Sequence, residues 1–535
     1  MNALKSHCRA LIVIGLALAS VTLSQAQTYT DLFDFDGTGH GCCATFPGTL
    51  AQGRDGNLYG TAVSGGANGR GAIFKITLSG TITDLHDFNV TDGSGPQGGL
   101  SLGLDGNFYG STNGGGSSSG GTVFKITPAG VHTVIYNFVS SATGGFPRSS
   151  PVQGSDGKLY GTTSIGGAIV YKMTTAGVLT KLATLGAECD TPLTLGIDGK
   201  FYGITNIGGT HNRGAVFSVT PAGVLTTVYS FNDPTGALPY GPIMQATDGV
   251  FYGTASTGGT LGSGVVYKLT PAGVYTVLHN FDNSTRANGI TPTTGLVQGS
   301  DGFLYGVTSG GGTALDGTIF RIKTDGTLFS VLHSFDGSHG ATPYSQPLLH
   351  TNGKIYGLTN LGGAHNDGVL YSFANGLKSF VAPVVLKGAK VGAAVGLLGQ
   401  NLSTTTQVLF GTGPGTFTLG ANGFMIVHPA AGANTGIITV KEPGGNLLSP
   451  QKFKIIPSIT SFSPTDGAVG AQVILTGMSF TGATAVKFAT GKAAVFTVNS
   501  DTHITATVPT GAVTGTIQVT TPGGTAISTT TFTVP

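Results

Sequence analysis

The sequence is poor in the residues from which many catalytic and carbohydrate-binding sites are built. Its 535 residues include no tryptophan, only 9% of them are charged, and glutamate occurs only as Glu188 and Glu442. The absence of tryptophan argues against a carbohydrate site made of broad aromatic platforms, a role left to tyrosine and phenylalanine. The scarcity of carboxylates leaves little from which to assemble an acid–base pair.

The net charge is small as well. Lys5 and Arg9 belong to an N-terminal segment with a basic start, an apolar run from Ala10 to Leu23 and small residues before Ala26, which is typical of a secretory signal. Its removal leaves 23 basic and 23 acidic residues. We therefore expect a signal peptide at 1–26 and an exported mature chain, secreted, at the cell surface or periplasmic, with no electrostatic attraction to nucleic acid or anionic membranes.

Long apolar runs and cysteines are also few. Beyond the signal segment no stretch is apolar for long enough to span a membrane, so no membrane span is expected. Three cysteines remain after residue 26, namely Cys42, Cys43 and Cys189. An oxidising compartment permits a disulfide, and three alternatives stay open: Cys189 with Cys42 or Cys43, a vicinal bond between Cys42 and Cys43, or isolated thiols.

The most informative feature that is present is a six-residue phrase that occurs seven times. Its first copy is Asp55-Gly-Asn-Leu-Tyr-Gly60, and later copies begin at Asp105, Asp156, Asp198, Asp248, Asp301 and Asn352. The spacings are 50, 51, 42, 50, 53 and 51 residues. A period near 50 that contains several short strands is typical of a propeller blade. We predict an all-β fold that begins with a seven-bladed β-propeller.

Each repeat contains four segments with strand character. An Asp-Gly turn joins the first two, because glycine accepts positive φ and aspartate can bond its own backbone two residues on. The third segment carries an aromatic residue at one fixed position, which we expect to be buried between neighbouring repeats. These residues are Phe74, Phe124, Tyr171, Phe217, Tyr267, Phe320 and Tyr371.

Only six complete fourth segments follow the seven repeats. The missing one resembles residues 29–35, whose sequence matches Tyr275–Phe281 almost position for position. We predict that this N-terminal strand pairs with the last repeat and closes a propeller that spans 27–380. Residues 377–380 are the competing segment for that outer position.

Strand parity separates two ends of the repeats. The Asp-Gly turns lie at one end, and the longer, variable connections lie at the other, which is the better candidate for recognition. There we expect ligand-binding residues in two loops, His211, Asn212 and Arg213 in the fourth repeat and His365, Asn366 and Asp367 in the seventh. Asp282 and Asp336, which follow fourth segments, are further candidates, with an Asx turn as the structural alternative.

Other polar positions are assigned to structure. His86, His279 and His333 occupy a position that holds tyrosine or phenylalanine in other repeats, which indicates packing. No metal-binding, nucleophile or phosphate-loop motif with diagnostic spacing occurs, so no catalytic residue, metal or cofactor is predicted.

From about Val381 the repeat stops. Ile459-Thr-Ser-Phe-Ser-Pro464, Val473-Ile-Leu-Thr-Gly477 and Pro522-Gly-Gly524 belong to a set of short strands that closely resembles the IPT/TIG family of immunoglobulin-like domains, over 457–535. The segment 381–456 looks like a divergent copy, in which the strand before Val-Pro is missing and Met425–Pro429 stands in its place. The resemblance implies two β-sandwich domains that act as spacer or adhesive modules.

The repeats resemble the GloVer (Gloeo_Verruco) tandem repeats of exported bacterial proteins, recognisable in Asp156–Thr163 and Gly264–Gly273. That resemblance implies no settled activity. Our leading hypothesis is a monomeric, non-enzymatic recognition or adhesion protein that binds extracellular polysaccharide or protein through the variable end of the propeller. The alternatives are a propeller lyase or hydrolase acting on polysaccharide or a lactone, and a structural cell-surface component.

Overall fold

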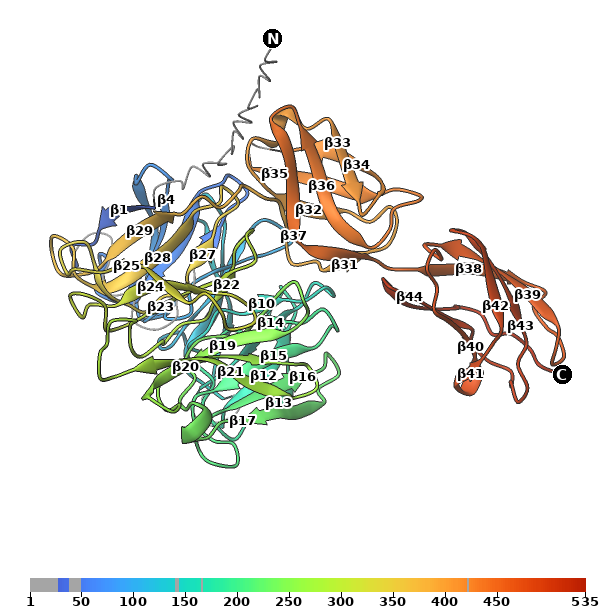
Figure 1. The fold of residues 1–535 in the computed structure, drawn as a ribbon, viewed down its shortest axis with the longest axis horizontal. Helices are drawn as coiled ribbons and strands as arrows, with labels where there is room; N and C mark the ends of the chain where they lie inside the picture. Colours follow the sequence, from blue (N-terminus) through green and yellow to red (C-terminus); the bar gives the residue numbers. More distant parts are fainter. Residues whose placement is uncertain (1–26, 38–49, 140–143, 165–166, 421–422) are drawn as a thin grey trace, which may run out of the picture.

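The computed structural model describes residues 27–37, 50–139, 144–164, 167–420 and 423–535, and this part of the chain is all-β (Figure 1). The predicted signal peptide, Cys42 and Cys43 lie outside the described residues. Within the described ranges, no helix is long and apolar enough to cross a membrane.

Seven antiparallel sheets occupy the chain between Thr28 and Ala374, and we call them together the seven-sheet unit. Sheets 1 to 6 are β2–β5, β6–β9, β10–β13, β14–β17, β18–β21 and β22–β25, each with its four strands in chain order. Sheet 7 contains β27, β28, β29 and β1, and β26 (Ala341–Pro343) also pairs with β28.

The strands of the seven sheets have the following bounds. The first strands are β2 (Ala51–Gln52), β6 (Ser101–Leu102), β10 (Val152–Gln153), β14 (Thr194–Leu195), β18 (Met244–Gln245), β22 (Val297–Gln298) and β27 (Leu348–Leu349). The second strands are β3 (Leu58–Ala62), β7 (Phe108–Thr112), β11 (Leu159–Thr162), β15 (Phe201–Thr205), β19 (Phe251–Ala255), β23 (Leu304–Thr308) and β28 (Ile355–Leu361). The third strands are β4 (Ala72–Ile76), β8 (Thr122–Ile126), β12 (Ile169–Met173), β16 (Ala215–Val219), β20 (Gly262–Leu269), β24 (Thr318–Ile322) and β29 (Val369–Ala374). The fourth strands are β5 (Ile82–Asp87), β9 (His132–Asn137), β13 (Leu179–Thr184), β17 (Leu225–Ser230), β21 (Tyr275–Asp282), β25 (Ser330–Ser334) and β1 (Thr28–Asp34).

The repeated phrase is explained by one hydrogen-bonded turn. In sheet 2, Asp105 Oδ1 accepts the backbone N–H of Asn107 at 3.1 Å, and Asp105 Oδ2 accepts the hydroxyl of Tyr109 at 2.9 Å. Gly106 has a φ of +85°, which favours glycine. Gly110 packs against the ring of Phe124, where a Cβ atom would overlap it. Each fixed residue of the phrase therefore serves the turn or the packing beneath it.

The same aspartate–tyrosine bond recurs around the unit. It joins Oδ2 to the hydroxyl over 2.6 to 2.9 Å in each of the six copies with aspartate. In the seventh copy Asn352 Nδ2 donates to the Tyr356 hydroxyl at 2.8 Å.

Seven hydrophobic clusters lie between successive sheets. Six of them join sheets 1 to 7 in order, and the seventh joins sheet 7 to sheet 1 through Tyr356, Leu358 and Leu370 on one side and Leu58 and Phe74 on the other. The seven fixed aromatic residues of the third strands are all buried, as the sequence predicts. The core contacts therefore form a closed circuit.

The outer strand of sheet 7 is the N-terminal β1. It pairs antiparallel with β29, from Thr28 opposite Ala374 to Asp34 opposite Val369. Tyr29 stacks on His333 of sheet 6 with ring centroids 4.0 Å apart, as Tyr275 stacks on Tyr229 at 4.1 Å. Residues 377–380 form no strand.

Two further β-units follow the seven sheets. The first contains β30 (Ala382–Pro383), β31 (Gly388–Ala389), β32 (Val395–Leu398), β33 (Gln407–Phe410), β34 (Gly413–Leu419), β35 (Phe424–Pro429), β36 (Gly436–Glu442) and β37 (Gly445–Ile455). The second contains β38 (Ser458–Ser463), β39 (Gln472–Met478), β40 (Ala485–Phe488), β41 (Lys492–Ala493), β42 (Phe496–Ser500), β43 (His503–Thr507), β44 (Gln518–Thr521) and β45 (Gly524–Ile527). Short 3-10 turns occur at Asp233–Thr235, Leu402–Thr404 and Ala489–Gly491.

The strand orders of these two units correspond. The last unit has two sheets, β38-β39-β43-β42 and β41-β40-β44-β45. The preceding unit has one path, β30-β32-β35-β34-β33-β36-β37-β31, in which the unbroken β34 takes the places of both β41 and β42. The prediction that 381–456 lacks the strand before Val-Pro is wrong: β35 fills that place with Phe424–Pro429, because buried Met425 and Val427 supply the inward-facing residues despite the changed sequence.

The unit of β30–β37 contacts the seven sheets at the end that carries the Asp-Gly turns, which we call the turn face (Figure 1). Lys454 Nζ donates to Ile197 O at 2.7 Å, and Gln451 Nε2 donates to Gln245 O at 2.8 Å. Arg54 lies over the ring of Phe424, 4.2 Å from its centroid. The opposite end, which carries the connections between sheets, is the loop face.

Candidate binding cavity

A cavity of about 660 Å³ opens among the sheets at the loop face. It is lined by the connections that lead into sheets 3 to 7, by residues that follow β15 and β19, and by Asn360 of β28. A cavity of this size holds a ligand of a few sugar rings or a small organic molecule.

Two positions of the repeat supply most of the lining. One lies eight residues before the first residue of the phrase, and the other lies eight residues after it. The first contributes Arg148, Asp190, Tyr240, Thr293 and Tyr344, and the second contributes Asn206, Ser256 and Asn360. The aspartate, the tyrosine and both glycines of the phrase are nearly constant, whereas the first of these two positions holds a different residue in almost every repeat and the second holds mainly asparagine or serine.

The segment that leads from the first position into β10 passes two cavities in turn. Arg148 lines the cavity at the loop face, while Ser150 and Val152 line a second cavity of about 290 Å³ deeper between the sheets. Lys387 and Gln451 of the β30–β37 unit close that second cavity from the turn face. Desolvation beside this cavity lowers the pKa of Lys387, although more than a third of the residue is exposed.

The charged groups of the loop-face cavity form one network. Asp190 is buried, with 4% of its side chain exposed, and its carboxylate accepts hydrogen bonds from Ser164 Oγ at 2.7 Å and Asn206 Nδ2 at 3.1 Å. Arg148 Nη1 lies 3.3 Å from Asp190 and 3.9 Å from Glu188. Because three donors already hold Asp190, Glu188, whose side chain is 40% exposed, is the carboxylate open to a ligand.

Two tyrosines add aromatic surface. Tyr240 and Tyr344 are partly exposed and lie in the lining. Burial, followed by the nearby charges of Asp190 and Glu188, raises the pKa of Tyr240. Its hydroxyl therefore stays protonated and can both donate and accept hydrogen bonds.

Several polar atoms around the cavity have no hydrogen-bond partner among the residues that the structure describes. They are Oδ1 of Asn206, Oδ1 of Asn360, Oγ1 of Thr293 and Nε of Arg148, and all four are buried. A buried polar atom without a partner costs about 1–3 kcal/mol. A ligand or a water molecule whose O–H groups form hydrogen bonds with these atoms would remove that free-energy cost.

The residues predicted as a binding site from sequence do not line this cavity. His211, Asn212, Arg213, His365, Asn366 and Asp367 lie in loops at the same end of the sheets. Asn212 and Asn366 have φ values of +54° and +59°, and their Oδ1 atoms accept the N–H of Gly208 and Gly362. Arg213 pairs with Asp233 at 2.7 Å. The two asparagines thus shape their own loops.

Asp282 and Asp336 act in turns. Asp282 Oδ1 accepts the N–H of Ser284 at 2.7 Å, and Asp336 Oδ1 accepts the N–H of His339 at 2.8 Å. Hydrogen bonds from His339 lower the pKa of Asp336 to about 2. These contacts are those of the Asx-turn alternative.

Cys189 lies beside this network as a buried free thiol. Burial raises its pKa to about 11, so the thiol stays protonated and unreactive. The disulfide alternatives that involve Cys42 and Cys43 fall outside the described residues.

The sequence carried a signal for the cavity that motif searching missed. The informative positions lie at a fixed distance from the constant residues of the phrase, and they hold arginine, aspartate, tyrosine, threonine, asparagine or serine in different repeats. No short motif contains them, because successive members are about 50 residues apart in the chain.

Similar solved structures are distant. A fungal alcohol oxidase of the AA5 family, in complex with copper, is 14% identical, with 92% of this chain and 98% of that chain covered and a TM-score of 0.41. A putative 6-phosphogluconolactonase from Bacteroides uniformis is 16% identical, with 54% and 84% covered and a TM-score of 0.37. A surface glycan-binding protein from Prevotella bryantii is 18% identical, with 29% and 41% covered and a TM-score of 0.22. These likenesses are too low to carry an argument.

Family comparison is more informative. No curated protein matches the chain. The IPT/TIG domain model matches residues 457–534. The model described as the Gloeobacter/Verrucomicrobia repeat matches three overlapping stretches, 18–194, 150–298 and 283–447. The chain therefore belongs to the Gloeobacter/Verrucomicrobia repeat family and ends in an IPT/TIG domain.

Proposed function

We propose that the protein is an exported recognition protein that binds extracellular polysaccharide in the loop-face cavity. In this proposal the seven sheets are the blades of a closed seven-bladed β-propeller within 27–380, followed by sandwich domains at 381–456 and 457–535. The closed circuit of core clusters supports the propeller, and the IPT/TIG domain fits a role at the cell surface.

One observation carries the choice of a saccharide. Buried acceptor atoms of Asn206, Asn360 and Thr293 lack partners around a cavity that also exposes two tyrosines. Sugar hydroxyls donate to amide and carboxylate oxygens, and the apolar face of a sugar ring packs on an aromatic ring. A purely apolar ligand would leave the three acceptors unpaired.

Catalysis is the second candidate, because Glu188, Asp190, Tyr240 and Tyr344 surround one cavity. A hydrolase or lyase needs such convergent acid or tyrosine groups. Asp190, however, is buried and held by three donors, which suits a fixed ion pair better than proton transfer. Binding without turnover is therefore the preferred function.

A glycan array followed by calorimetry on the best ligand tests the binding proposal. Asn360→Ala and Tyr344→Ala should each weaken binding about 10-fold, because they remove an acceptor and an aromatic face. Asn113→Ala is the matched control, since Asn113 occupies the same repeat position and also has an unpartnered Oδ1 but does not line the cavity. Equal affinity of all variants, or no saturable glycan, would contradict the proposal.

The same ligand tests the enzyme alternative. Prolonged incubation with the wild-type protein should release no new reducing end and no unsaturated product. If product forms and Glu188→Gln abolishes it while binding persists, the protein is an enzyme and the preferred function is wrong.

A further inference from the structure

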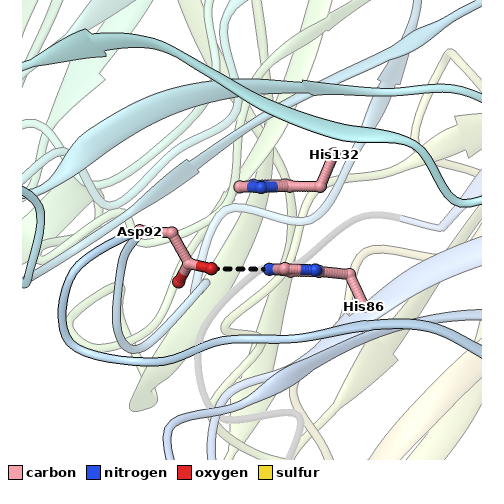
Figure 2. A group of neighbouring side chains, drawn as sticks. All are labelled: His86, Asp92 and His132. Atoms are coloured by element: carbon pink, nitrogen blue, oxygen red, sulfur yellow. Dashed lines mark hydrogen bonds and ion pairs between the residues drawn. The ribbon is translucent and has the colours of Figure 1, made fainter.

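Three potential metal ligands meet where sheet 1 packs against sheet 2 (Figure 2). His86 is near the end of β5, His132 begins β9, and Asp92 lies in the connection that follows β5. One ligand atom from each residue can be chosen so that all three lie within 4.8 Å of one another. Two imidazoles and a carboxylate are a common donor set for Zn²⁺ and related divalent ions.

The two histidines occupy a stacking position that recurs between sheets. At the same place Tyr229 stacks on Tyr275, His279 on Phe329, and His333 on Tyr29, with centroids 3.8 to 4.1 Å apart. The fold therefore accepts tyrosine or phenylalanine at either side of the stack. Among these four stacks, His86 with His132 is the one in which both rings carry metal-binding nitrogens.

The carboxylate is held in place by its own loop. Asp92 Oδ1 accepts the backbone N–H of Asn89 at 2.9 Å, and Asp92 Oδ2 lies 3.0 Å from both Asn89 Nδ2 and His86 Nε2. Such supporting contacts orient ligands at metal sites and reduce the cost of assembling them.

His132 is the ligand free to adjust. Its Nε2 is buried and has no hydrogen-bond partner among the residues that the structure describes. A neutral imidazole nitrogen of this kind can bind a metal ion. None of the three residues lines the loop-face cavity, so this feature is separate from the proposed saccharide site.

We propose that His86, Asp92 and His132 bind one divalent transition-metal ion, with Zn²⁺ as the probe of choice, and that the ion links sheet 1 to sheet 2. The rings now stack 4.0 Å apart with planes 6° from parallel, so their lone pairs do not converge. Binding requires the His132 ring to turn out of the stack toward Asp92. It also requires His86 to carry its proton on Nδ1, so that Nε2 offers its lone pair. Water completes the coordination.

Cobalt substitution gives a direct test. The mature chain, freed of metal with a chelator, is titrated with Co²⁺ while the visible d–d absorption is followed, and Zn²⁺ is then added in competition. Wild type should bind one equivalent, and Zn²⁺ should raise the melting temperature. His132→Tyr, which keeps a ring like Tyr275, and Asp92→Asn should each weaken binding at least 10-fold and abolish the thermal shift.

His279→Tyr is the matched control, because His279 belongs to an equivalent stack outside the three-residue group. It should bind Co²⁺ like wild type. The metal-free melting temperatures of all variants are measured first, so that a folding defect is distinguished from a lost ligand. Absence of stoichiometric binding, or equal binding by His132→Tyr and Asp92→Asn, would overturn the proposal and, in the second case, place the ion at other groups.

Discussion

The two faces of the seven-sheet unit differ in how much their residues vary. On the turn face, six aspartates make the same pair of bonds to the backbone and to tyrosine, and the β30–β37 unit covers part of the surface. On the loop face, the first repeat position that lines the cavity holds arginine, aspartate, tyrosine or threonine, and the second holds asparagine or serine. Residues that are the same in almost every repeat thus stabilise the turns, and residues that differ between repeats form the surface available for recognition.

The reason lies in what each face must satisfy. Every tight Asp-Gly turn brings a backbone donor and a tyrosine hydroxyl to the same carboxylate, and a substitution would leave one of them unpaired. Residues that border an open cavity have no such local partner in common. They can change without loss of the sheet that carries them.

Removal of β1 should have the largest effect, because β1 completes sheet 7 and the two faces exist only while the seven sheets pack together. Deleting residues 27–36 removes every pair between β1 and β29 and the stack of Tyr29 on His333. We expect the melting temperature to fall by about 10 °C or more in calorimetry. Thr30→Ala, an exposed change in the same strand, should leave it unaltered. A deletion variant that melts like wild type would show that β1 does not close the unit.

Two alanine substitutions in sheet 2 compare the packing of the repeated phrase with the loop face. Gly110→Ala places a methyl group into the ring of Phe124 and should cost about 1–3 kcal/mol of unfolding free energy. Gly114→Ala, at the loop-face end of the same strand, meets only Ser94 O at 3.9 Å and should change stability by less than about 0.5 kcal/mol. Urea denaturation measures both. Equal costs would erase the distinction.

Acid should weaken the turn face at Asp105. Burial raises the pKa of Asp105, but hydrogen bonds from Asn107 and Tyr109 outweigh it and hold the pKa below its usual value. The folded state therefore binds fewer protons than the unfolded state, and the stability is lost as pH falls from about 3.9 through the folded pKa. Tyr109→Phe should cost about 1–2 kcal/mol at neutral pH and flatten this acid dependence. An unchanged pH profile in urea denaturation would contradict the assignment.

The smallest expected effect concerns Lys387, at the covered end of the deeper cavity. Desolvation lowers its pKa, but more than a third of Lys387 is exposed and solvent screens its charge, so only a small penalty on the charged form remains, and that penalty is relieved as pH rises toward the unfolded value of about 10.4. Lys387→Met should raise the melting temperature by about 1–2 °C at neutral pH and by less at alkaline pH. Lys390→Met is the control, because Lys390 is also exposed but does not line the cavity. Destabilisation by Lys387→Met would show that the ammonium group makes favourable contacts in the cavity.

Much of the fold could be read from the chain. The repeated phrase predicts the turn and the strand that follows, because its hydrogen bonds join residues no more than four positions apart, such as Asp105 and Tyr109. The match of residues 29–35 to Tyr275–Phe281 pointed to the outer strand of sheet 7. The missing strand of 381–456 was misread because inward-facing apolar residues, not a shared motif, define β35.

The candidate site was harder to find. His211 and His365 stand out in glycine-rich loops, yet the asparagines beside them cap those loops and the cavity lies elsewhere. Arg148 and Asp190 are 42 residues apart in the chain, and their side chains lie 3.3 Å apart. The pattern of residues near either position cannot predict such a pair, since the contact depends on how one sheet packs against the next.

The sequence by itself determined the number of repeats, the four strands of each and the turn that joins the first two, because these follow from contacts between near neighbours in the chain. Only the tertiary structure decided which side chains share the loop-face cavity, which end of the sheets the β30–β37 unit covers, and that His86, Asp92 and His132 meet. Those outcomes depend on the angle and register between sheets, and packing of buried residues distant in the chain sets both.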